Sequence, residues 1–430
     1  MNRNRDGSQS ENAGPHNRVK QNKDTKLNIH YAEIQASYWI VGTIFCVFTV
    51  PMLQERGYTA VEIGTLTALR AVAAIVMQPV WAGIQSRCRE RVPIKRWILL
   101  LCLISLGLTV MEWLQTFRFP AACILYLVYG ATLFCIQPFV DAMATQFMAV
   151  RKRLNYSFCR CMGSVSWAVS CAVFGNAVLW FGADSILVFQ GIGLILTLLA
   201  AISIETCRGK AENGTEKGAN RPESESVWQI VKNYPRFRWF LAASACMFVG
   251  NYMSYNFLAD VVRKLGGSTA DMGYVQFIAA VCEIPVGFFF LKIQRKLTNR
   301  RVMAGVFFFV FLKLLLVDLA GSIQVLLTAQ VLQMFGLAFF WSGNIYYIFE
   351  HLPEVNHVKG VALVTVCNMG IGACFGSLIS GNLLQYFGIR AVTAAGAFCA
   401  FAGLMIMLLN GLGERKDSAQ TSAAENNVFS

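Results

Sequence analysis

Apolar stretches long enough to cross a lipid bilayer recur along almost the whole chain. Their approximate limits are 30–53, 61–85, 97–116, 120–148, 155–181, 184–204, 236–262, 270–293, 301–320, 322–350, 358–384 and 389–411. A helix needs about 20 mostly apolar residues to span the hydrocarbon layer, so each stretch is long enough. Only 14% of the residues are charged, whereas soluble domains carry about 25%. This pattern predicts an all-α membrane protein with twelve transmembrane helices.

Lysine and arginine residues are distributed unevenly between the two sides of the predicted membrane. The segments on the side of the N-terminus hold 29 of them and the opposite segments hold five. The positive-inside rule therefore places both termini in the cytoplasm. Most of the net charge of +13 follows from this topology, so we expect no nucleic-acid partner. The remaining three, Arg70, Arg160 and Lys313, fall inside predicted helices.

A polar linker at 205–235 separates the helices into two groups of six. The linker is rich in Gly, Glu, Asn and Ser, which is typical of a flexible tether. We therefore predict an N-terminal half at 29–204 and a C-terminal half at 236–411, joined by a cytoplasmic linker. The polar ends, residues 1–28 and 412–430, are predicted to be disordered cytoplasmic tails, and the first lacks the apolar core of a signal peptide.

The sequence contains no nucleotide-binding loop, redox motif or cluster of potential metal ligands. Its four histidines lie in the N-terminal tail or near loops, without the spacing of metal ligands. We therefore expect neither an enzyme nor an ATP-driven pump, and no cofactor or metal. The expected location is the inner (plasma) membrane of the cell, where a multi-pass protein contacts the lipid bilayer, and a monomer is favoured.

Two opposite charges lie at matching depth on consecutive predicted helices. Asp141 precedes the end of its helix by about seven residues, and Arg160 follows the start of the next by about five. At a rise of about 1.5 Å per residue, both lie roughly 8–10 Å inside the same boundary. Because a lone charge in hydrocarbon is unfavourable, we expect the two side chains to pair. The pair either holds polar groups of a ligand or braces the half; Trp167, two turns after Arg160, favours a ligand with a ring.

The six-plus-six pattern resembles the major facilitator superfamily. Gln78-Pro79, followed by Gly83 and a basic stretch, is similar to the signature loop after the second helix of that superfamily. The acidic residue of that loop is missing here, where Ser86 or Arg87 stands in its place. The resemblance implies two halves that alternate in exposing a central cavity to the two sides of the membrane.

A second resemblance concerns the stretch that contains the two charges. Pro138 and Asp141, then Arg160, Gly163 and Trp167, have the spacing of the lactose-permease-like oligosaccharide:proton symporter branch. It implies that the acid and the arginine hold sugar hydroxyls and that the tryptophan stacks on the sugar ring. Nucleoside and phenylpropionate permease branches share a similar arginine–glycine–tryptophan turn, so the turn does not fix the substrate.

The residues that handle protons in that permease are not carried over to this chain. Polar or apolar residues occupy the matching positions, at Met253, Asn256, Gln330, Gln333 and Gly336. Glu283 instead lies near the middle of the predicted eighth helix, with Lys313 at similar depth on the following one. The two form either a brace or a proton-coupling site, and we expect coupling because ionisable residues inside membranes tend to mark ion paths.

Neutral polar residues are expected to complete the cavity from the C-terminal half. They are Asn251, Tyr255 and Asn256 in the seventh helix, Gln333 in the tenth and Asn368 in the eleventh. Transporter sites usually lie between repeats near the middle of the membrane. In the second helix, Arg70 either faces this cavity as an anion anchor or extends toward the membrane surface. A cavity-facing Arg70, together with Arg160, would favour a negatively charged substrate.

The function expected from these residues is secondary active transport, most simply proton-coupled symport of a small polar solute with a ring. A sugar-like or nucleoside-like molecule fits the Asp141, Arg160 and Trp167 set, and protons would be the second partner. Import of an aromatic carboxylate and efflux of drugs are alternatives with the same fold. A sensor that binds a solute without transporting it is the alternative of another class.

Overall fold

A computed structural model describes residues 15–88, 91–149, 154–205 and 225–428, and within them the chain is helical with no β-strand. The N-terminal elements are α1 (Pro15–Thr43), α2 (Thr49–Glu55), α3 (Ala60–Arg87), α4 (Ile94–Leu114), α5 (Phe119–Thr132), α6 (Ile136–Ala149), α7 (Tyr156–Phe181), α8 (Ser185–Ser203) and α9 (Val227–Asn233). They are followed by α10 (Pro235–Asn256), α11 (Leu258–Lys264), α12 (Thr269–Glu283), α13 (Val286–Gln294), α14 (Asn299–Asp318), α15 (Ile323–Val331), α16 (Leu337–His351), α17 (His357–Thr365), α18 (Ala373–Phe387) and α19 (Ile389–Val428).

Helices occupy all twelve stretches that the sequence predicts. Within the described residues, nine helical segments are long and apolar enough to cross a membrane. The other three are more polar or are interrupted: α10 begins with two arginines, α12 ends at Glu283 two residues before Pro285, and α14 carries Lys313. The all-helical prediction is confirmed, and the crossing of the membrane by all twelve stretches remains a prediction.

Four of the twelve predicted helices are interrupted by a short irregular turn. A π-helical turn, Ile44–Phe48, joins α1 to α2, and another, Val366–Gly372, joins α17 to α18. Tighter 3₁₀ turns, Leu133–Cys135 and Leu332–Met334, interrupt the fourth and tenth predicted helices. Such interruptions release backbone carbonyl groups from the helical ladder, and in membrane proteins they occur where protein or water can bind those groups.

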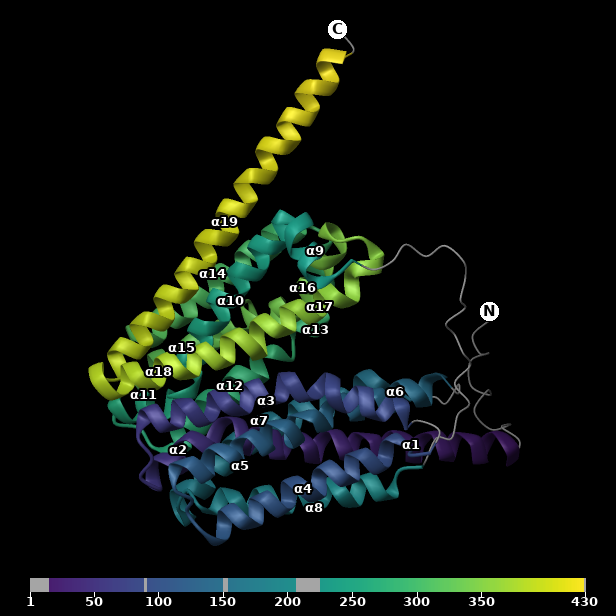
Figure 1. Ribbon diagram of the computed structural model, residues 1–430, viewed down its shortest axis with the longest axis vertical. Coiled ribbons are helices and arrows are strands. Elements are labelled where there is room, and N and C mark those ends of the chain that lie inside the picture. The colour runs from purple at the N-terminus through teal and green to yellow at the C-terminus, as the bar shows by residue number, and fades with distance from the viewer. Residues whose placement is uncertain (1–14, 89–90, 150–153, 206–224, 429–430) are drawn as a thin grey trace, which may run out of the picture.

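The helices form two groups, which we call the two halves. In Figure 1, α1 to α8 run roughly horizontally and α10 to α19 are tilted against them; the groups lie close at the left, near α2 and α11, and diverge to the right. One core of buried apolar side chains fills the N-terminal half and extends into α11, α12 and α15, and a second core fills the rest of the C-terminal half. The halves therefore pack tightly at one end only, the end predicted to face away from the cytoplasm.

Glycines permit this close contact at two helix crossings between the halves. At the crossing of α3 with α18, a Cβ atom on Gly381 would lie 2.5 Å from the carbonyl oxygen of Ala60 and 3.1 Å from the Cα of Gly64. At the crossing of α7 with α12, a Cβ atom on Gly175 would lie 3.0 Å from the Cα of Gly273. At both crossings backbone meets backbone, a distance that only residues without a side chain allow.

Hydrogen bonds between the halves reinforce the same end. The Gln54 side chain donates to Asp260 (2.7 Å) and accepts from Arg263 (3.3 Å), which is itself ion-paired with Asp260 at 3.0 Å. On the other side of the interface, the Asn176 amide donates to the Tyr274 hydroxyl at 3.3 Å. We call Gln54, Asp260 and Arg263 the outer latch; it must break when the halves separate at this end.

Both predicted tails and the linker contain helix that the sequence did not indicate. α1 begins at Pro15, within the predicted tail 1–28, and α19 continues to Val428, through most of the predicted tail 412–430. Extending an existing helix is much easier than nucleating a new one, so polar residues that would be disordered alone can continue it. In the predicted linker 205–235, Ser226 caps the short α9; residues 206–224 and 1–14 lie outside the described chain.

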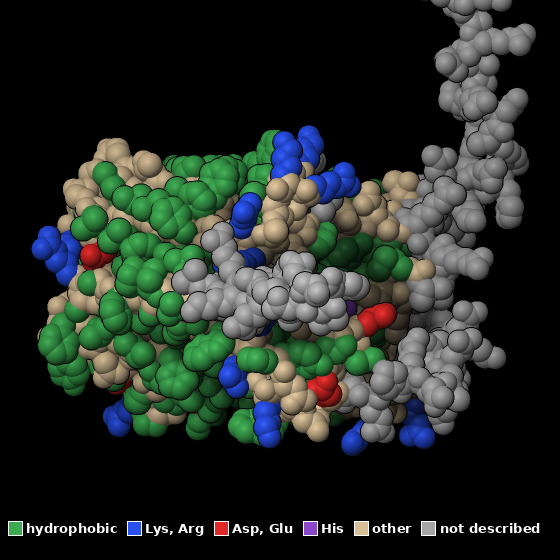
Figure 2. All heavy atoms as spheres, turned by 90° about the horizontal axis from the view of Figure 1, so that it is seen from above, with side chains coloured by type: hydrophobic (Ala, Val, Ile, Leu, Met, Phe, Trp, Pro, Cys, Tyr) green, Lys and Arg blue, Asp and Glu red, His purple; other side chains and the backbone are tan. Residues whose placement is uncertain are grey.

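The outer surface of the bundle is apolar. Hydrophobic side chains cover much of the face in Figure 2, most continuously at its left, and Lys and Arg form separate groups. Large exposed apolar side chains include Trp180, Phe181, Tyr386 and Phe398. A soluble monomer rarely exposes so much contiguous apolar surface, so this one suits contact with lipid.

We expect Gly381→Leu to open the outer end. The new side chain would overlap backbone atoms, which costs about 1–3 kcal/mol and raises the open population about five- to a hundredfold. Cys171, which is fully buried and whose carbonyl oxygen contacts Gly273, should then be alkylated faster by a maleimide, as resolved by peptide mass spectrometry. Cys102, buried inside the N-terminal half, is the internal reference.

Gly107→Leu is the matched control, because no atom lies within 4 Å of a Cβ placed on this helical glycine. Equal alkylation of Cys171 in both variants would mean that the crossing of α3 with α18 does not hold this end closed.

Candidate functional site

An indole that the sequence reasoning did not single out lies between the predicted arginine and the predicted tryptophan. The guanidinium carbon of Arg160 lies 4.7 Å from the ring centroid of Trp39, over its face. The rings of Trp39 and Trp167 meet edge to face, with centroids 5.7 Å apart and planes at 69°. An arginine over an indole is held by the negative charge of the ring face. Helices α1 and α7 together build a row of three groups, in which Trp39 contacts the cation on its face and Trp167 edge to face.

Gly163 makes this arrangement possible. A Cβ atom at this position would overlap Cδ1 of Trp39 and would lie 3.0 Å from its Nε1. The indole of α1 therefore occupies the space that any larger residue of α7 would fill. The Arg160–Gly163–Trp167 spacing has a local physical reason: the glycine is the gap into which a ring from the neighbouring helix inserts, with the arginine and the tryptophan on either side.

Asp141 and Arg160 do not form the predicted ion pair. Asp141 instead accepts hydrogen bonds from the Gln137 amide (2.9 Å) and from the Tyr156 hydroxyl (3.0 Å). Tyr156 interacts electrostatically with both charges. The two charges therefore belong to one cluster, in which Tyr156 is their common neighbour.

Two buried polar atoms of this cluster have no hydrogen-bond partner: Nε1 of Trp39 and Oε1 of Gln137. Most buried polar atoms in native proteins are satisfied by protein or by ordered water. A donor and an acceptor without a partner, close to two charged side chains, therefore indicate a place where a ligand or water supplies the missing hydrogen bonds. We call Trp39, Gln137, Asp141, Tyr156, Arg160 and Trp167 the ring site.

Arg70 faces the interior and does not extend toward the membrane surface. It is only 7% exposed, and its Nη1 donates to the carbonyl oxygen of Phe45 at 2.7 Å. Its guanidinium carbon also lies 4.9 Å from the centroid of the Phe45 ring and 6.0 Å from that of Phe134. Phe45 belongs to the π-helical turn after α1.

The C-terminal half presents two tyrosines to this arginine. Tyr252 and Tyr255 of α10 are half-buried and lie close enough to Arg70 and Cys46 for electrostatic interaction. Their rings pack edge to face with centroids 6.3 Å apart. Arg70, which the sequence left undecided, therefore belongs to the contact region between the halves. Tyr255 was predicted as a cavity residue of the C-terminal half.

Glu283 and Lys313 are connected through a third residue. The Lys313 ammonium donates to Oε1 of Gln333 at 2.6 Å, and Nε2 of Gln333 donates to Glu283 at 2.8 Å. Gln333 lies in the 3₁₀ turn before α16, and Glu283 is the last residue of α12. The predicted direct pair is thus replaced by an amide bridge, formed where two helices are interrupted. All three side chains belong to the C-terminal half and lie apart from the ring site.

The remaining predicted residues have different surroundings. Asn256 is buried and donates to the Ser377 hydroxyl at 2.7 Å, so it joins α10 to α18 within one half. Asn368 is buried inside the π-helical turn after α17. Asn251 is half-buried on α10. The hydrogen bond of Asn256 is structural, because Asn256 and Ser377 lie in the same half.

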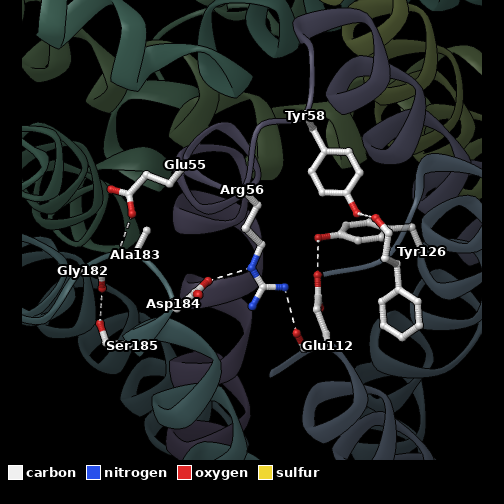
Figure 3. A network of polar contacts seen from close by, with 10 residues as sticks. Glu55, Arg56, Tyr58, Glu112, Tyr126, Gly182, Ala183, Asp184 and Ser185 are labelled. Carbon is white, nitrogen blue, oxygen red and sulfur yellow. Dashed lines mark hydrogen bonds and ion pairs between the residues drawn. The ribbon is translucent and has the colours of Figure 1, made fainter. Parts of the chain in front are cut away.

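A second polar network lies at the outer end of the N-terminal half (Figure 3). Arg56 is ion-paired with Asp184 at 2.7 Å and donates to the backbone carbonyl of Glu112 at 2.8 Å. The Glu112 carboxylate accepts from the Tyr126 hydroxyl at 3.0 Å and is only 3% exposed. Glu112 lies near a helix end, a position typical of residues at the membrane–water interface. The turn that carries Arg56 covers Glu112. The network ties the turns that carry Arg56 and Asp184 to the end of α4 and to α5.

Only some of the site residues that were not predicted could have been found from a sequence pattern. Gln137 precedes Asp141 by one helical turn, so an i, i+4 pair could have been predicted. Trp39 gave no such signal, since nothing in its own stretch shows which neighbouring helix it meets. Within the described residues, no three potential metal ligands lie close enough to hold an ion.

Comparisons with known proteins agree with this architecture. A family model, the MFS_1 like family, matches residues 37–394. The maltose permease of Geobacillus stearothermophilus is 23% identical over 389 residues, which cover 88% of this chain and 93% of that protein. The uncharacterized transporter YwbF of Bacillus subtilis (strain 168) is 21% identical over 388 residues, with the same coverage.

Among solved structures, the nucleoside transporter NupG superimposes with a TM-score of 0.70 at 11% identity, over 91% of this chain and 98% of that one. At this identity the likeness shows the fold alone, and it confirms the predicted resemblance. The chain belongs to the MFS_1 like family and is a multi-pass membrane transporter of the major facilitator superfamily.

Proposed function

We propose that the protein is a proton-coupled symporter of a small polar solute that contains a sugar-like or nucleoside-like ring. One observation carries this proposal: a guanidinium and two indoles, from α1 and α7, pack in a row with Trp39 between Arg160 and Trp167, and Tyr156 links this row to the hydrogen-bonded carboxylate of Asp141. Aromatic faces suit the apolar face of a ring, and the polar groups suit its hydroxyls. The maltose permease at 23% identity supports a sugar.

Each member of the ring site has a distinct role in this proposal. Trp167 stacks on the solute ring, and Trp39 places the Arg160 fork while offering its own N–H group. Arg160 donates to ring or hydroxyl oxygens, because its rigid planar fork directs several donors at once. Asp141 accepts from hydroxyls, and Tyr156 and Gln137 hold its carboxylate in place.

The arrangement of the halves supports alternating access. They pack at the outer end and diverge toward the end where the linker joins α8 to α9 (Figure 1). A solute bound at the ring site would become accessible from outside when the outer latch and the glycine crossings separate. Most of the predicted cavity residues of the C-terminal half, including Tyr255, would then contact the solute only in some states of the cycle.

Proton coupling is assigned to the bridge of Glu283, Gln333 and Lys313. A carboxylate and an ammonium joined through an amide can gain or lose a proton with only small movements of the side chains. The bridge lies at the interruptions of α12 and of the tenth predicted helix, so movement of either segment changes its geometry. We place the transporter in the plasma (inner) membrane, as a monomer.

Uptake into proteoliposomes distinguishes a transporter from a sensor. Purified protein should first be screened by thermal shift against sugars, nucleosides and aromatic acids. The compound that binds should then accumulate in vesicles when a pH gradient is imposed, and collapse of the gradient should stop accumulation. A compound that binds but never crosses would favour the sensor, and an aromatic acid as the best ligand would favour the carboxylate importer.

Arg160→Lys should abolish binding of that solute and leave the folded protein intact. An ammonium can lie near the Trp39 ring but cannot direct several donors from one plane, so we expect a loss of affinity of at least a hundredfold. Isothermal titration measures the affinity, and the thermal unfolding temperature monitors the fold. Arg118→Lys, at an exposed position, is the control. Unchanged affinity in Arg160→Lys would make the cation–indole contact purely structural.

Glu283→Gln should uncouple transport from protons. The neutral amide keeps the hydrogen bond to Gln333 but cannot exchange a proton, so downhill exchange should continue while uphill accumulation under a pH gradient falls at least tenfold. The exposed Glu354→Gln is the control. If Glu283→Gln still accumulates solute against its gradient, the proton is carried elsewhere and the bridge is a brace.

A further inference from the structure

Arg70 is a buried cation without an anionic partner. Among the described side chains, no carboxylate lies within the 4 Å of an ion pair, and the one hydrogen bond of its guanidinium goes to the Phe45 carbonyl. A guanidinium carries five N–H donors, so most of them are left open. A buried, uncompensated charge is unfavourable in a membrane protein, and such residues tend to mark binding sites.

Two tyrosine hydroxyls of the other half lie near this cation. Tyr252 and Tyr255 come from the C-terminal half, are half-buried, and make no hydrogen bond to another described residue through their hydroxyls. The guanidinium, which can only donate, and the two phenols, which can donate, thus lie together where the halves meet. Such a set of donors suits an oxyanion, because charge-assisted hydrogen bonds are the strong ones.

The helical segment that contains α1 relates this point to the ring site. Trp39 in α1 and Cys46 in the π-helical turn that follows are seven residues apart, which is about 10 Å along the helix axis. Cys46 is the neighbour of Arg70 and the tyrosines, and Trp39 is the neighbour of Arg160. One continuous helical segment, Thr25–Glu55, therefore passes from the aromatic cluster to the cationic one.

We propose that Arg70, Tyr252 and Tyr255 form an anion subsite, and that the transported solute is an acidic glycoside whose carboxylate binds there. The ring of such a solute occupies the ring site, and a second unit spans the 10 Å or so between the two points. The charges agree: Arg70 and Arg160 are two cations, Asp141 is one anion, and a carboxylate balances the set. This inference rests on the proposed transport of a ring-containing solute and adds the charge and length of that solute.

A structural role for Arg70 makes a different prediction. If the arginine only braces the π-helical turn through Phe45, its loss weakens the binding of neutral and acidic solutes to the same extent. If it binds a carboxylate, its loss weakens only the acidic one. The ratio of the two affinities is therefore the quantity to measure.

The experiment compares matched pairs of probes by isothermal titration of the purified full-length protein. The pairs are phenyl β-glucoside with phenyl β-glucuronide, and maltose with the disaccharide in which the non-reducing glucose is replaced by glucuronate. We expect the wild type to bind at least one acid at least tenfold more tightly than its neutral partner. Arg70→Gln should remove this preference and leave the affinity for the neutral partner within about threefold.

Two further variants keep the test valid if Arg70→Gln does not fold. Arg70→Lys retains a cation and should retain part of the acid preference, whereas Tyr255→Phe removes one hydroxyl donor and should reduce the preference severalfold. The exposed Arg118→Gln, which removes a charge from a loop, should change neither affinity.

The outcomes separate the two proposals. Equal binding of acid and neutral partner by the wild type, or a preference that survives in Arg70→Gln and Tyr255→Phe, overturns the anion subsite but leaves transport of a ring-containing solute standing. Failure of every sugar, nucleoside and acid to bind the wild type overturns the proposed function and the subsite with it.

Discussion

The contact of the Arg160 guanidinium with the Trp39 indole determines how the rest of the site is arranged. In hydrocarbon a cation needs a partner, and the expected one was the carboxylate of Asp141 at equal depth. An aromatic face takes that place at 4.7 Å, and the carboxylate is held by a phenol and an amide. The charges are thereby stabilised without neutralising each other. A directly paired arginine would have to give up its carboxylate before binding a solute, whereas Arg160 forms no ion pair with a described carboxylate.

Depth along a helix can be read from a sequence, but the direction in which a side chain points between helices cannot. This is why the sequence brought Asp141, Arg160 and Trp167 into one cluster and did not identify Trp39. The repeated apolar stretches predict the helical fold and its division into two halves, because burial in lipid imposes a nearly constant length on each membrane-spanning segment. The amide bridge through Gln333 was missed for a different reason. It depends on interruptions of two helices, and Pro285 signals only one of them.

The two charged clusters differ in kind. The ring site of the N-terminal half surrounds its charges with aromatic rings and leaves two of its buried polar atoms without a partner, Trp39 Nε1 and Gln137 Oε1. The C-terminal half joins Glu283 to Lys313 through a closed chain of hydrogen bonds. Polar atoms without a partner suit recognition of a ligand, and a complete chain of hydrogen bonds suits a change in protonation. Arg70 and its two tyrosines lie where the halves meet, so binding of a ligand there would depend on how far the two halves are separated.

The glycine crossings have a consequence for how such a protein can change over evolutionary time. Their contacts are made by backbone atoms, so forming or breaking them requires no side chain to find a new rotamer. A single added methyl group at Gly64 or Gly381 would shift the balance between closed and open forms. It would do so at a distance from every residue that recognises a solute. Turnover rate and substrate choice can therefore be adjusted by separate mutations in the same chain.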